Sequence, residues 1–164
     1  PLMRPSKEEY YLNIAREVAS RATCLRRKFG AVIVKNDVIL STGYTGAPRK
    51  SANCTDIGVC PRQKAGIPPG QRYELCRSVH AEMNAIINAA RSGTSILGGT
   101  MYVYMIDLTG AASNIALKPC RMCRRMIINA GIKEVIFGDG KRVFRYNVDD
   151  WVKEEDEFNL GGGY

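Results

Sequence analysis

The stretch Ala-Val-Ile-Val-Lys-Asn-Asp-Val-Ile-Leu, residues 31–40, decides the fold class of this chain. Two β-branched runs lie on either side of Lys35-Asn36-Asp37, a pattern that predicts a β-hairpin with its turn at Asn36-Asp37. Just upstream, Ser6 and Glu9 form a capping box, which marks the start of a helix. Apolar residues then recur at every fourth position, so we expect an amphipathic helix over residues 7–22.

Downstream of the hairpin, predicted helices and strands alternate along the chain. The expected elements are a helix from Val79 to a C-terminal Gly93, a strand over 101–105, a helix opened by Pro119 and ended by Gly131, and strands over 134–137 and 142–146. Strands that alternate with helices after an initial hairpin predict an α/β fold. We expect a three-layer α/β/α sandwich with a mixed, roughly five-stranded sheet.

The length of 164 residues suits one domain over 1–164. Residues 43–77 carry several Gly and Pro, three of the cysteines and no hydrophobic period, so they predict a long Cys-rich loop with a functional role. The acidic segment 153–156 and the glycines at 161–163 predict a solvated, mobile C-terminal tail.

The composition limits the classes of function. No apolar run is long enough to cross a bilayer, and residues 1–11 lack the apolar core of a secretory signal. We therefore expect a soluble, cytoplasmic protein that does not contact a membrane. Six cysteines in such a compartment point to metal binding more than to structural disulfides.

The net charge of +8 favours an anionic partner, from a mononucleotide phosphate to a nucleic acid. The Lys and Arg residues are scattered, however, and form no extended basic stripe. This scatter argues against a nucleic-acid partner.

Two short motifs carry the chemistry: His80-Ala81-Glu82, and Pro119-Cys120-Arg121-Met122-Cys123. Together they match the H-x-E and P-C-x-x-C signature of zinc-dependent nucleobase deaminases. His80, Cys120 and Cys123 provide three zinc ligands, which leaves the fourth tetrahedral position for water, as in catalytic zinc sites. Glu82 is then the general acid and base that moves protons between this water and the base.

Simpler interpretations exist for each motif alone. A lone C-x-x-C is often a structural zinc knuckle or a redox pair, and a lone histidine is often a core residue. His80 is, however, the only histidine in the chain, and an Ala-rich helix has no structural need for Glu82. The combination favours a catalytic site.

Beyond these motifs, the sequence resembles the deoxycytidylate (dCMP) deaminases of the cytidine-deaminase superfamily. The resemblance rests on segments in family order, at residues 24–27, 30–35, 43–48, 74–82, 119–120 and 127–132. It implies conversion of dCMP to dUMP for thymidylate synthesis by a homo-oligomer, a hexamer or a dimer. It also implies activation by dCTP and inhibition by dTTP, with Mg²⁺ on the triphosphate.

Four residues are candidates for contact with the substrate. Arg26, in a basic run, is a candidate for the phosphate, the backbone amide of Ala81 for the base, and Tyr104 for the pocket lining. Thr45 stands where the family usually has Asn beside the nucleotide sugar, and a hydroxyl cannot copy an amide's two-sided hydrogen bonding. A second departure is extra chain over residues 106–118, at the lip of the pocket. Both departures bear on which nucleotide is used.

The remaining cysteines are Cys24, Cys54, Cys60 and Cys76. The chain resembles bacterial and phage relatives that carry a second, structural zinc, and four thiolates would close a tetrahedral site. Such a metal would also hold the Cys-rich loop in place. Buried or free thiols are the alternative.

Other functions fit parts of the pattern. A tRNA or DNA base deaminase would use the same zinc site, although such relatives tend to lack the Cys-rich loop. A deaminase of another free nucleotide or of a modified base is a further alternative. A Cys-rich zinc module for protein interaction is the non-enzymatic one, and it has no use for Glu82 beside an open metal position.

Overall fold

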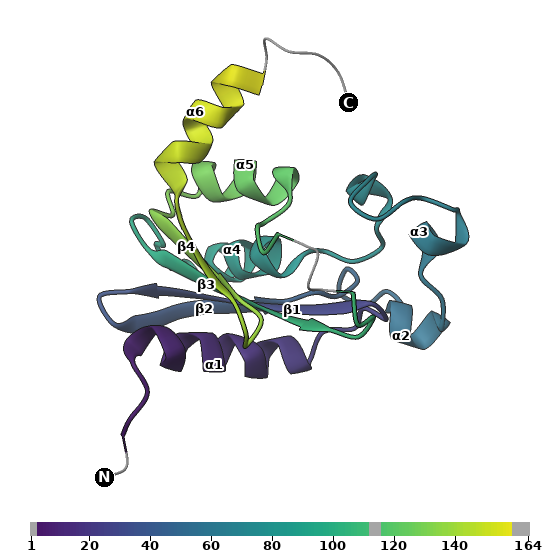
Figure 1. Ribbon diagram of the computed structural model, residues 1–164, viewed down its shortest axis with the longest axis horizontal. Helices are drawn as coiled ribbons and strands as arrows, with labels where there is room; N and C mark the ends of the chain where they lie inside the picture. The colour runs from purple at the N-terminus through teal and green to yellow at the C-terminus, as the bar shows by residue number, and fades with distance from the viewer. Residues whose placement is uncertain (1–2, 112–115, 159–164) are drawn as a thin grey trace.

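The computed structural model describes residues 3–111 and 116–158. Its elements follow in the order α1 (Lys7–Ser20), β1 (Arg27–Lys35), β2 (Val38–Tyr44), α2 (Cys54–Ile57), α3 (Pro61–Lys64), the 3₁₀ helix η1 (Tyr73–Leu75), α4 (Ala81–Ser92), β3 (Thr100–Asp107), α5 (Arg121–Asn129), β4 (Glu134–Gly138), β5 (Val143–Asn147) and α6 (Val148–Phe158). The expected α/β class and the five-stranded mixed sheet are confirmed (Figure 1).

The sheet has the strand order β2-β1-β3-β4-β5, and only β3 and β4 run parallel. The predicted hairpin joins β1 to β2. Asn36 and Asp37 both have positive φ, 51° and 60°, as the tight turn of a two-residue hairpin requires. The helix predicted from the capping box is α1, with the Ser6 hydroxyl accepting from the backbone N–H of Glu9 at 3.1 Å.

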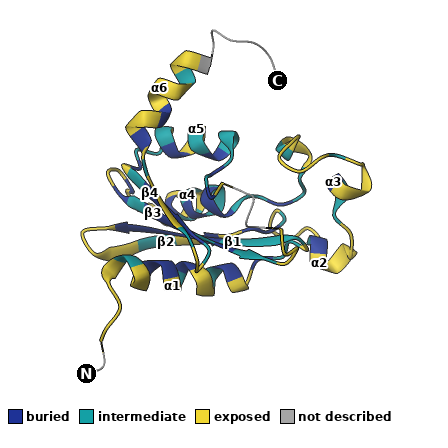
Figure 2. Cartoon of the chain, viewed as in Figure 1, coloured by how far each residue is buried: buried dark blue, intermediate teal, exposed yellow. Residues whose placement is uncertain are grey.

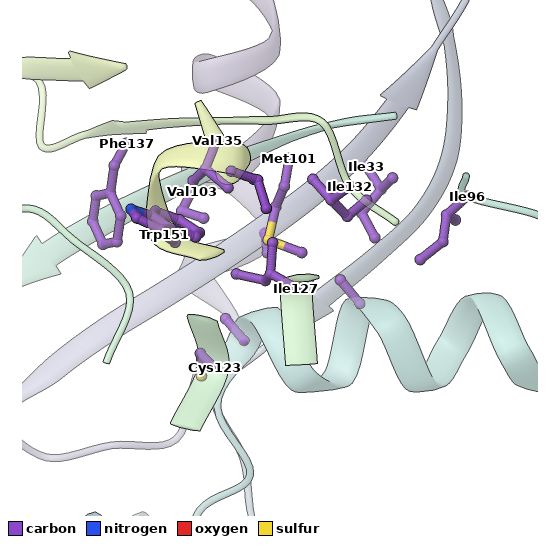
Figure 3. Packing of buried hydrophobic residues seen from close by; sticks show 14 of the residues in the cluster. Ile33, Ile96, Met101, Val103, Cys123, Ile127, Ile132, Val135, Phe137 and Trp151 are labelled. Carbon is purple, nitrogen blue, oxygen red and sulfur yellow. The ribbon is translucent and has the colours of Figure 1, made fainter. Parts of the chain in front are cut away.

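Helices cover both faces of the sheet, which gives the three layers (Figure 1). Helix α1 packs on one face, where Tyr11, Leu12 and Ala15 meet Val32 and Ile136. Helices α4, α5 and α6 lie on the other face, over a larger core. Figure 3 shows members of this larger core, including Met101, Val103, Val135, Phe137, Ile127, Cys123 and Trp151.

Two glycines allow the helices to lie directly on the backbone of the sheet. A Cβ at Gly30 would come within 2.3 Å of the Ala15 carbonyl oxygen in α1. A Cβ at Gly43 would come within 2.2 Å of the Ala85 backbone nitrogen in α4. Real Cβ atoms do not approach other atoms so closely, so only glycine fits at these crossings.

The expected mobile tail is wrong for the part of it that the structure describes. Residues 148–158 form helix α6, because Val148 and the 2% exposed Trp151 are buried in the larger core. The segment 153–156 is therefore helical, with Glu154 and Glu155 paired to Arg124 and Arg121 of α5, and the sequence reasoning missed the two apolar anchors before it. The glycines at 161–163 lie outside the described residues.

Two further boundaries differ from expectation. Helix α5 begins at Arg121 with Cys120 as its N-cap, so Pro119 precedes the cap and is not the first helical residue. The Cys-rich loop over 43–77 contains the short helices α2, α3 and η1, which are largely exposed (Figure 2). In the described part of the chain, no helix combines the length and apolar character needed to traverse a bilayer.

Candidate functional site

The site lies where two helices begin. His80 is the N-cap of α4 and Cys120 is the N-cap of α5, so each residue sits at the point where extended chain turns into helix. An antiparallel bridge between Gly46 and Val79 fixes the chain just before His80, with backbone hydrogen bonds of 3.2 and 2.7 Å. The position of the imidazole is thereby set by regular backbone on both sides.

His80, Cys120 and Cys123 form the one group of three or more potential metal ligands found in the described residues, with ligand atoms within 4.8 Å of one another. The Sγ atoms of both cysteines lie 3.4 Å from the Nδ1 atom of His80. Tetrahedral zinc, with bonds of about 2.3 Å to sulfur and 2.0 Å to nitrogen, separates such ligands by about 3.5 Å. The three side chains therefore fit a zinc ion without rearrangement.

The three side chains of this cluster change one another's pKa. A hydrogen bond from Cys123 lowers the pKa of the Cys120 thiol to about 4, while the same bond and burial raise the pKa of Cys123. Burial alone would lower the pKa of His80, but the thiols of Cys120 and Cys76 outweigh it and raise this pKa to about 10. Without a metal, the thiolate of Cys120 therefore faces a protonated imidazole, and metal binding would release the protons of His80 and Cys123.

Glu82 lies in the first turn of α4 and is 5% exposed. One carboxyl oxygen, Oε2, is 3.7 Å from the Sγ atom of Cys123, so the carboxyl group borders the ligand cluster. Burial raises the pKa of Glu82, with the His80 charge acting in the opposite direction. A carboxyl group with a raised pKa can both accept and return a proton near neutral pH.

The structure brings two of the four substrate candidates close to this cluster. Ala81 follows His80 directly and is fully buried. Thr45 adjoins the Gly46–Val79 bridge, and its buried hydroxyl has no hydrogen-bond partner among the described residues.

The other two candidates are not adjacent to the cluster in the chain, and only Tyr104 is turned away from it. Tyr104 packs against the α1 side of the sheet, because strand alternation turns Tyr102 and Tyr104 to that face and Val103 and Met105 to the other. This placement takes Tyr104 away from the cluster. Arg26 lies just before β1, where its backbone carbonyl accepts from the N–H of Leu108. Residues 112–115 of the extra chain over 106–118 lie outside the described residues.

The four other cysteines are neighbours but do not form a tight cluster. The thiol of the buried Cys54 feels the charges of Cys24, Cys60 and Cys76, while burial raises its pKa. Burial acts to raise the pKa of the Cys76 thiol, but the neighbouring ring of His80 outweighs it and lowers this pKa. Cys76 therefore lies between the loop cysteines and the His80 cluster.

Sequence reasoning missed two residues at the edge of the site. The ring of Tyr73 meets the ring of His80 edge-on, with centroids 5.6 Å apart. The guanidinium of Arg62 lies over the same tyrosine, 4.6 Å from its centroid. The available signal was weak: one aromatic residue in a polar, Gly- and Pro-rich loop, seven positions before the histidine.

Known proteins share the sequence motifs of this site. Residues 5–139 match the family model described as the cytidine and deoxycytidylate deaminase zinc-binding region. The deoxycytidylate deaminase of Mycobacterium phage D29 is 36% identical over 141 residues, which cover 83% of this chain and 97% of the relative. The deoxycytidylate deaminase of Saccharomyces cerevisiae is 34% identical over 143 residues, 87% of this chain but only 41% of that longer relative.

A solved structure is similar as well. The dCMP deaminase of the cyanophage S-TIM5, in complex with dCMP and dUMP, has a TM-score of 0.59 and 29% sequence identity. The match covers 82% of each chain.

Proposed function

Because the chain belongs to the cytidine and deoxycytidylate deaminase zinc-binding family, we propose that it is a zinc-dependent hydrolase that converts dCMP and water to dUMP and ammonia. The observation that carries this proposal is the buried carboxyl group of Glu82 beside the His80, Cys120 and Cys123 cluster. The relative with dCMP and dUMP bound supports the choice of nucleotide. The product would supply dUMP for thymidylate synthesis.

The three ligands would be the Nδ1 atom of His80 and the Sγ atoms of Cys120 and Cys123. Two thiolates and a neutral imidazole balance the charge of Zn²⁺ and leave a fourth position free. When bound, zinc supplies a Lewis acid that makes water reactive at neutral pH.

Glu82 would carry the protons of the reaction. Its carboxylate accepts a proton from the attacking water and donates it to ring nitrogen N3, while the oxygen adds to C4 of the cytosine ring. The carboxyl group then accepts the second water proton and donates it to the departing amine. The C4–N4 bond breaks, ammonia leaves, and the carboxylate is restored.

Three residues would position the nucleotide. The backbone N–H of Ala81, at the start of α4, would contact the base, and the Thr45 hydroxyl would contact the sugar. The unpartnered hydroxyl of Thr45 supports this role, because a buried hydroxyl without a hydrogen bond is unfavourable until a ligand provides one. Arg26 would contact the phosphate.

A deamination screen tests the substrate. The rate of absorbance change would be measured for dCMP, CMP, dCTP, deoxycytidine and single-stranded oligonucleotides with zinc-loaded protein. We expect dCMP to have the highest kcat/KM. Equal or greater kcat/KM on another compound would overturn the choice of dCMP, and no deamination at all would overturn the enzymatic proposal.

We also infer regulation by dCTP and dTTP, with Mg²⁺ on the triphosphate. A cavity of about 560 Å³ lies against the outer side of α4 and the end of β2, and its lining includes Tyr44 and Asn84. Four cations line it: Arg21, Arg49, Lys50 and Arg91. None of its described lining residues is acidic, which favours an anion with several phosphates. Activity titrations with each triphosphate test this inference.

The Cys24, Cys54, Cys60 and Cys76 set would hold a second, structural zinc. Its support is that the charges of the other three reach Cys54, in a loop with almost no core of its own. A cytoplasmic location stays part of this proposal, because thiols kept for metal binding suit a reducing compartment. Exposed apolar residues on the edge strand β5, Val143 and Phe144, support a homo-oligomer, a hexamer or a dimer.

A further inference from the structure

Arg62 is a buried cation without a buried counter-ion. It is 6% exposed, and one guanidinium nitrogen, Nη2, donates to the carbonyl oxygens of Gln71 and Pro68. Its Nε is buried and has no hydrogen-bond partner, and no carboxylate in the described ranges lies within ion-pair distance. Burial of an unpaired charge is unfavourable. The local structure would therefore gain from an anion beside Arg62.

Tyr73 connects this cation to the metal centre. One side of its ring faces the Arg62 guanidinium at 4.6 Å, in the geometry of a cation–π contact. Its ring also meets the His80 imidazole edge-on at 5.6 Å. Tyr73 therefore contacts both Arg62 and His80. The phosphate of a nucleotide is the end of the molecule most distant from the exocyclic amine, so a cation that reaches the metal ligands only through a neighbouring side chain suits the phosphate better than the base.

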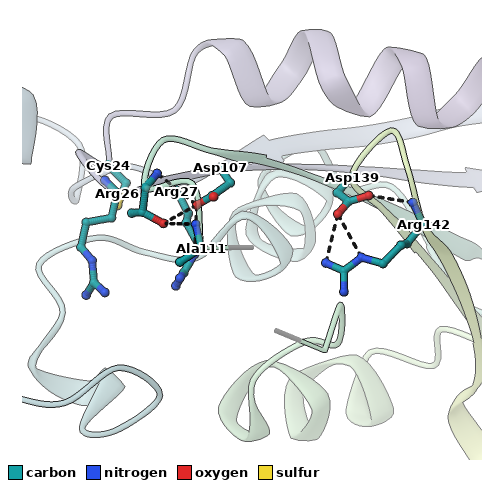
Figure 4. Close-up of polar contacts among 8 residues, drawn as sticks. Cys24, Arg26, Arg27, Asp107, Ala111, Asp139 and Arg142 are labelled. Carbon is teal, nitrogen blue, oxygen red and sulfur yellow. Dashed lines mark hydrogen bonds and ion pairs between the residues drawn. The ribbon is translucent and has the colours of Figure 1, made fainter. Parts of the chain in front are cut away.

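The charges of two more guanidinium groups reach the phenol of Tyr73. Burial raises the pKa of this phenol, while the charges of Arg62, Arg27 and Arg26 lower it. Arg26 and Arg27 both extend away from α1 (Figure 4). Arg27 is paired with Asp107 at 3.5 Å, so it is the most nearly neutralised of the three. Arg62, Arg26 and the Tyr73 hydroxyl remain as donors for an external anion.

We propose that Arg62 and Tyr73 complete, with Arg26, the subsite for the 5′-phosphate of the substrate, and so distinguish nucleotides from nucleosides. The inference rests on the proposed deamination of a cytosine nucleotide. A guanidinium presents a planar fork of donors that matches phosphate oxygens, and a phenol adds one more donor. The Cys-rich loop, through α3 and η1, thereby supplies the part of the pocket that recognises charge.

Binding of dUMP and of 2′-deoxyuridine to zinc-loaded protein, measured by calorimetry, tests this subsite without catalysis. Arg62→Met removes the charge and keeps the length of the chain, and Tyr73→Phe removes only the hydroxyl. Lys64→Met is the matched control, since it removes an exposed charge from the same short helix α3. We expect Arg62→Met to weaken dUMP binding about 10- to 100-fold and Tyr73→Phe about 10-fold, the range for hydrogen bonds to a charged group.

Deoxyuridine binding should change by less than about twofold in both variants, and Lys64→Met should leave both ligands unaffected. Equal loss of dUMP and deoxyuridine binding in both variants would overturn the phosphate subsite and leave only a structural role. The same conclusion follows if the unaltered protein binds deoxyuridine as tightly as dUMP. If Arg62→Met fails to fold, Tyr73→Phe decides alone. If the unaltered protein binds dUMP but does not deaminate dCMP, the proposed function would be overturned and the phosphate subsite would stand.

Discussion

The two sets of cysteines in this chain differ in how closely their thiols approach one another and in the structure that surrounds them. Cys120 and Cys123 stand at the start of a regular helix, within 3.4 Å of the His80 Nδ1 atom, in the arrangement that a tetrahedral metal requires. Cys24 precedes β1, and Cys54, Cys60 and Cys76 lie in the Cys-rich loop; these four thiols are not gathered as closely as the His80, Cys120 and Cys123 cluster.

The difference lies in what supports each set. Helices α4 and α5 are packed on the sheet through a continuous apolar core, so their first turns are fixed before any ligand arrives. The loop has three short helical turns, and most of its side chains are exposed. A loop without a core depends on a metal or on a bound anion for its order. The regular region is thus preorganised, whereas the loop would gain order from the metal and the phosphate that we propose for it.

The largest effect should come from Glu82→Gln in the preorganised region. Removal of the proton carrier should lower kcat by about 10³-fold or more, near the upper range for general acid–base catalysis. Zinc content and melting temperature should stay near those of the unaltered protein, because Gln keeps the size of the side chain. Steady-state kinetics with metal analysis check this, and Glu74→Gln in the loop is the control. Retained activity in Glu82→Gln would remove the proposed mechanism.

The next largest effect is a loss of stability when Trp151, which packs in the larger core beside α5, is truncated. Trp151→Ala should lower the free energy of unfolding by about 3–5 kcal/mol, because it empties a fully enclosed site in the larger core. Ile57→Ala in the loop, where the side chain is 44% exposed, should cost less than about 1 kcal/mol. Urea unfolding of both variants measures the contrast. Similar losses would mean that the loop is as well packed as the sheet.

A smaller effect should separate the two metal sites. We expect about two zinc ions per unaltered chain and about one in Cys60→Ser, with faster proteolysis between residues 54 and 75 but measurable deamination. Cys123→Ser should instead abolish deamination and leave the loop resistant to protease. Emission spectrometry and limited proteolysis give the two readouts. A value of one zinc in the unaltered protein would show that the loop cysteines hold no metal.

The smallest effect is a pH dependence of the free energy of unfolding, which we expect from Asp139 and not from Glu74. Asp139, between β4 and β5, accepts from the backbone N–H groups of Lys141 and Arg142 at 2.9 and 2.8 Å and pairs with the Arg142 side chain (Figure 4). Burial acts to raise the pKa of Asp139, but these contacts outweigh it and lower the pKa. The stabilisation is therefore present above the ordinary Asp pKa near 4 and is lost as pH falls through the lower, folded value.

Asp139→Asn should thus reduce the free energy of unfolding by about 1 kcal/mol at pH 7, and the difference from the unaltered protein should shrink below about pH 4. Glu74 in the loop also has a lowered pKa, through its contact with Arg72, but both side chains are exposed. Glu74→Gln should therefore have no measurable effect at any pH. Urea unfolding from pH 3 to 7 compares the two variants. A pH-independent difference for Asp139→Asn would contradict the assigned contacts.

The sheet and the metal ligands could be predicted from the sequence because their signals are local. The β-branched runs around Asn36-Asp37 define the hairpin, and the histidine and cysteine motifs each lie on one helix start. Helix α6 was missed because its evidence is tertiary: the acidic segment 153–156 looks solvated until Val148 and Trp151 are seen to enter the core.

The placement of aromatic residues was harder to predict for a similar reason. Which face of β3 Tyr104 occupies depends on the register of the strand, and a one-residue shift exchanges the faces. Tyr73 and Arg62 lie in a loop with no period, so only the folded chain shows that they meet near His80. The functional role of the loop stays a prediction from its composition, and the contacts that give it a proposed chemistry are visible only in the three-dimensional arrangement.

At Gly43 the backbone of α4 packs directly against the backbone of β2. Since the helix rests on bare main chain, its height above the sheet is set by covalent geometry and atomic radii and not by the rotamer of an intervening side chain. A helix seated on a leucine could shift whenever that side chain changed rotamer. The ends of α4, and the imidazole and carboxyl group attached there, are therefore insulated from the rotameric fluctuations of the interior.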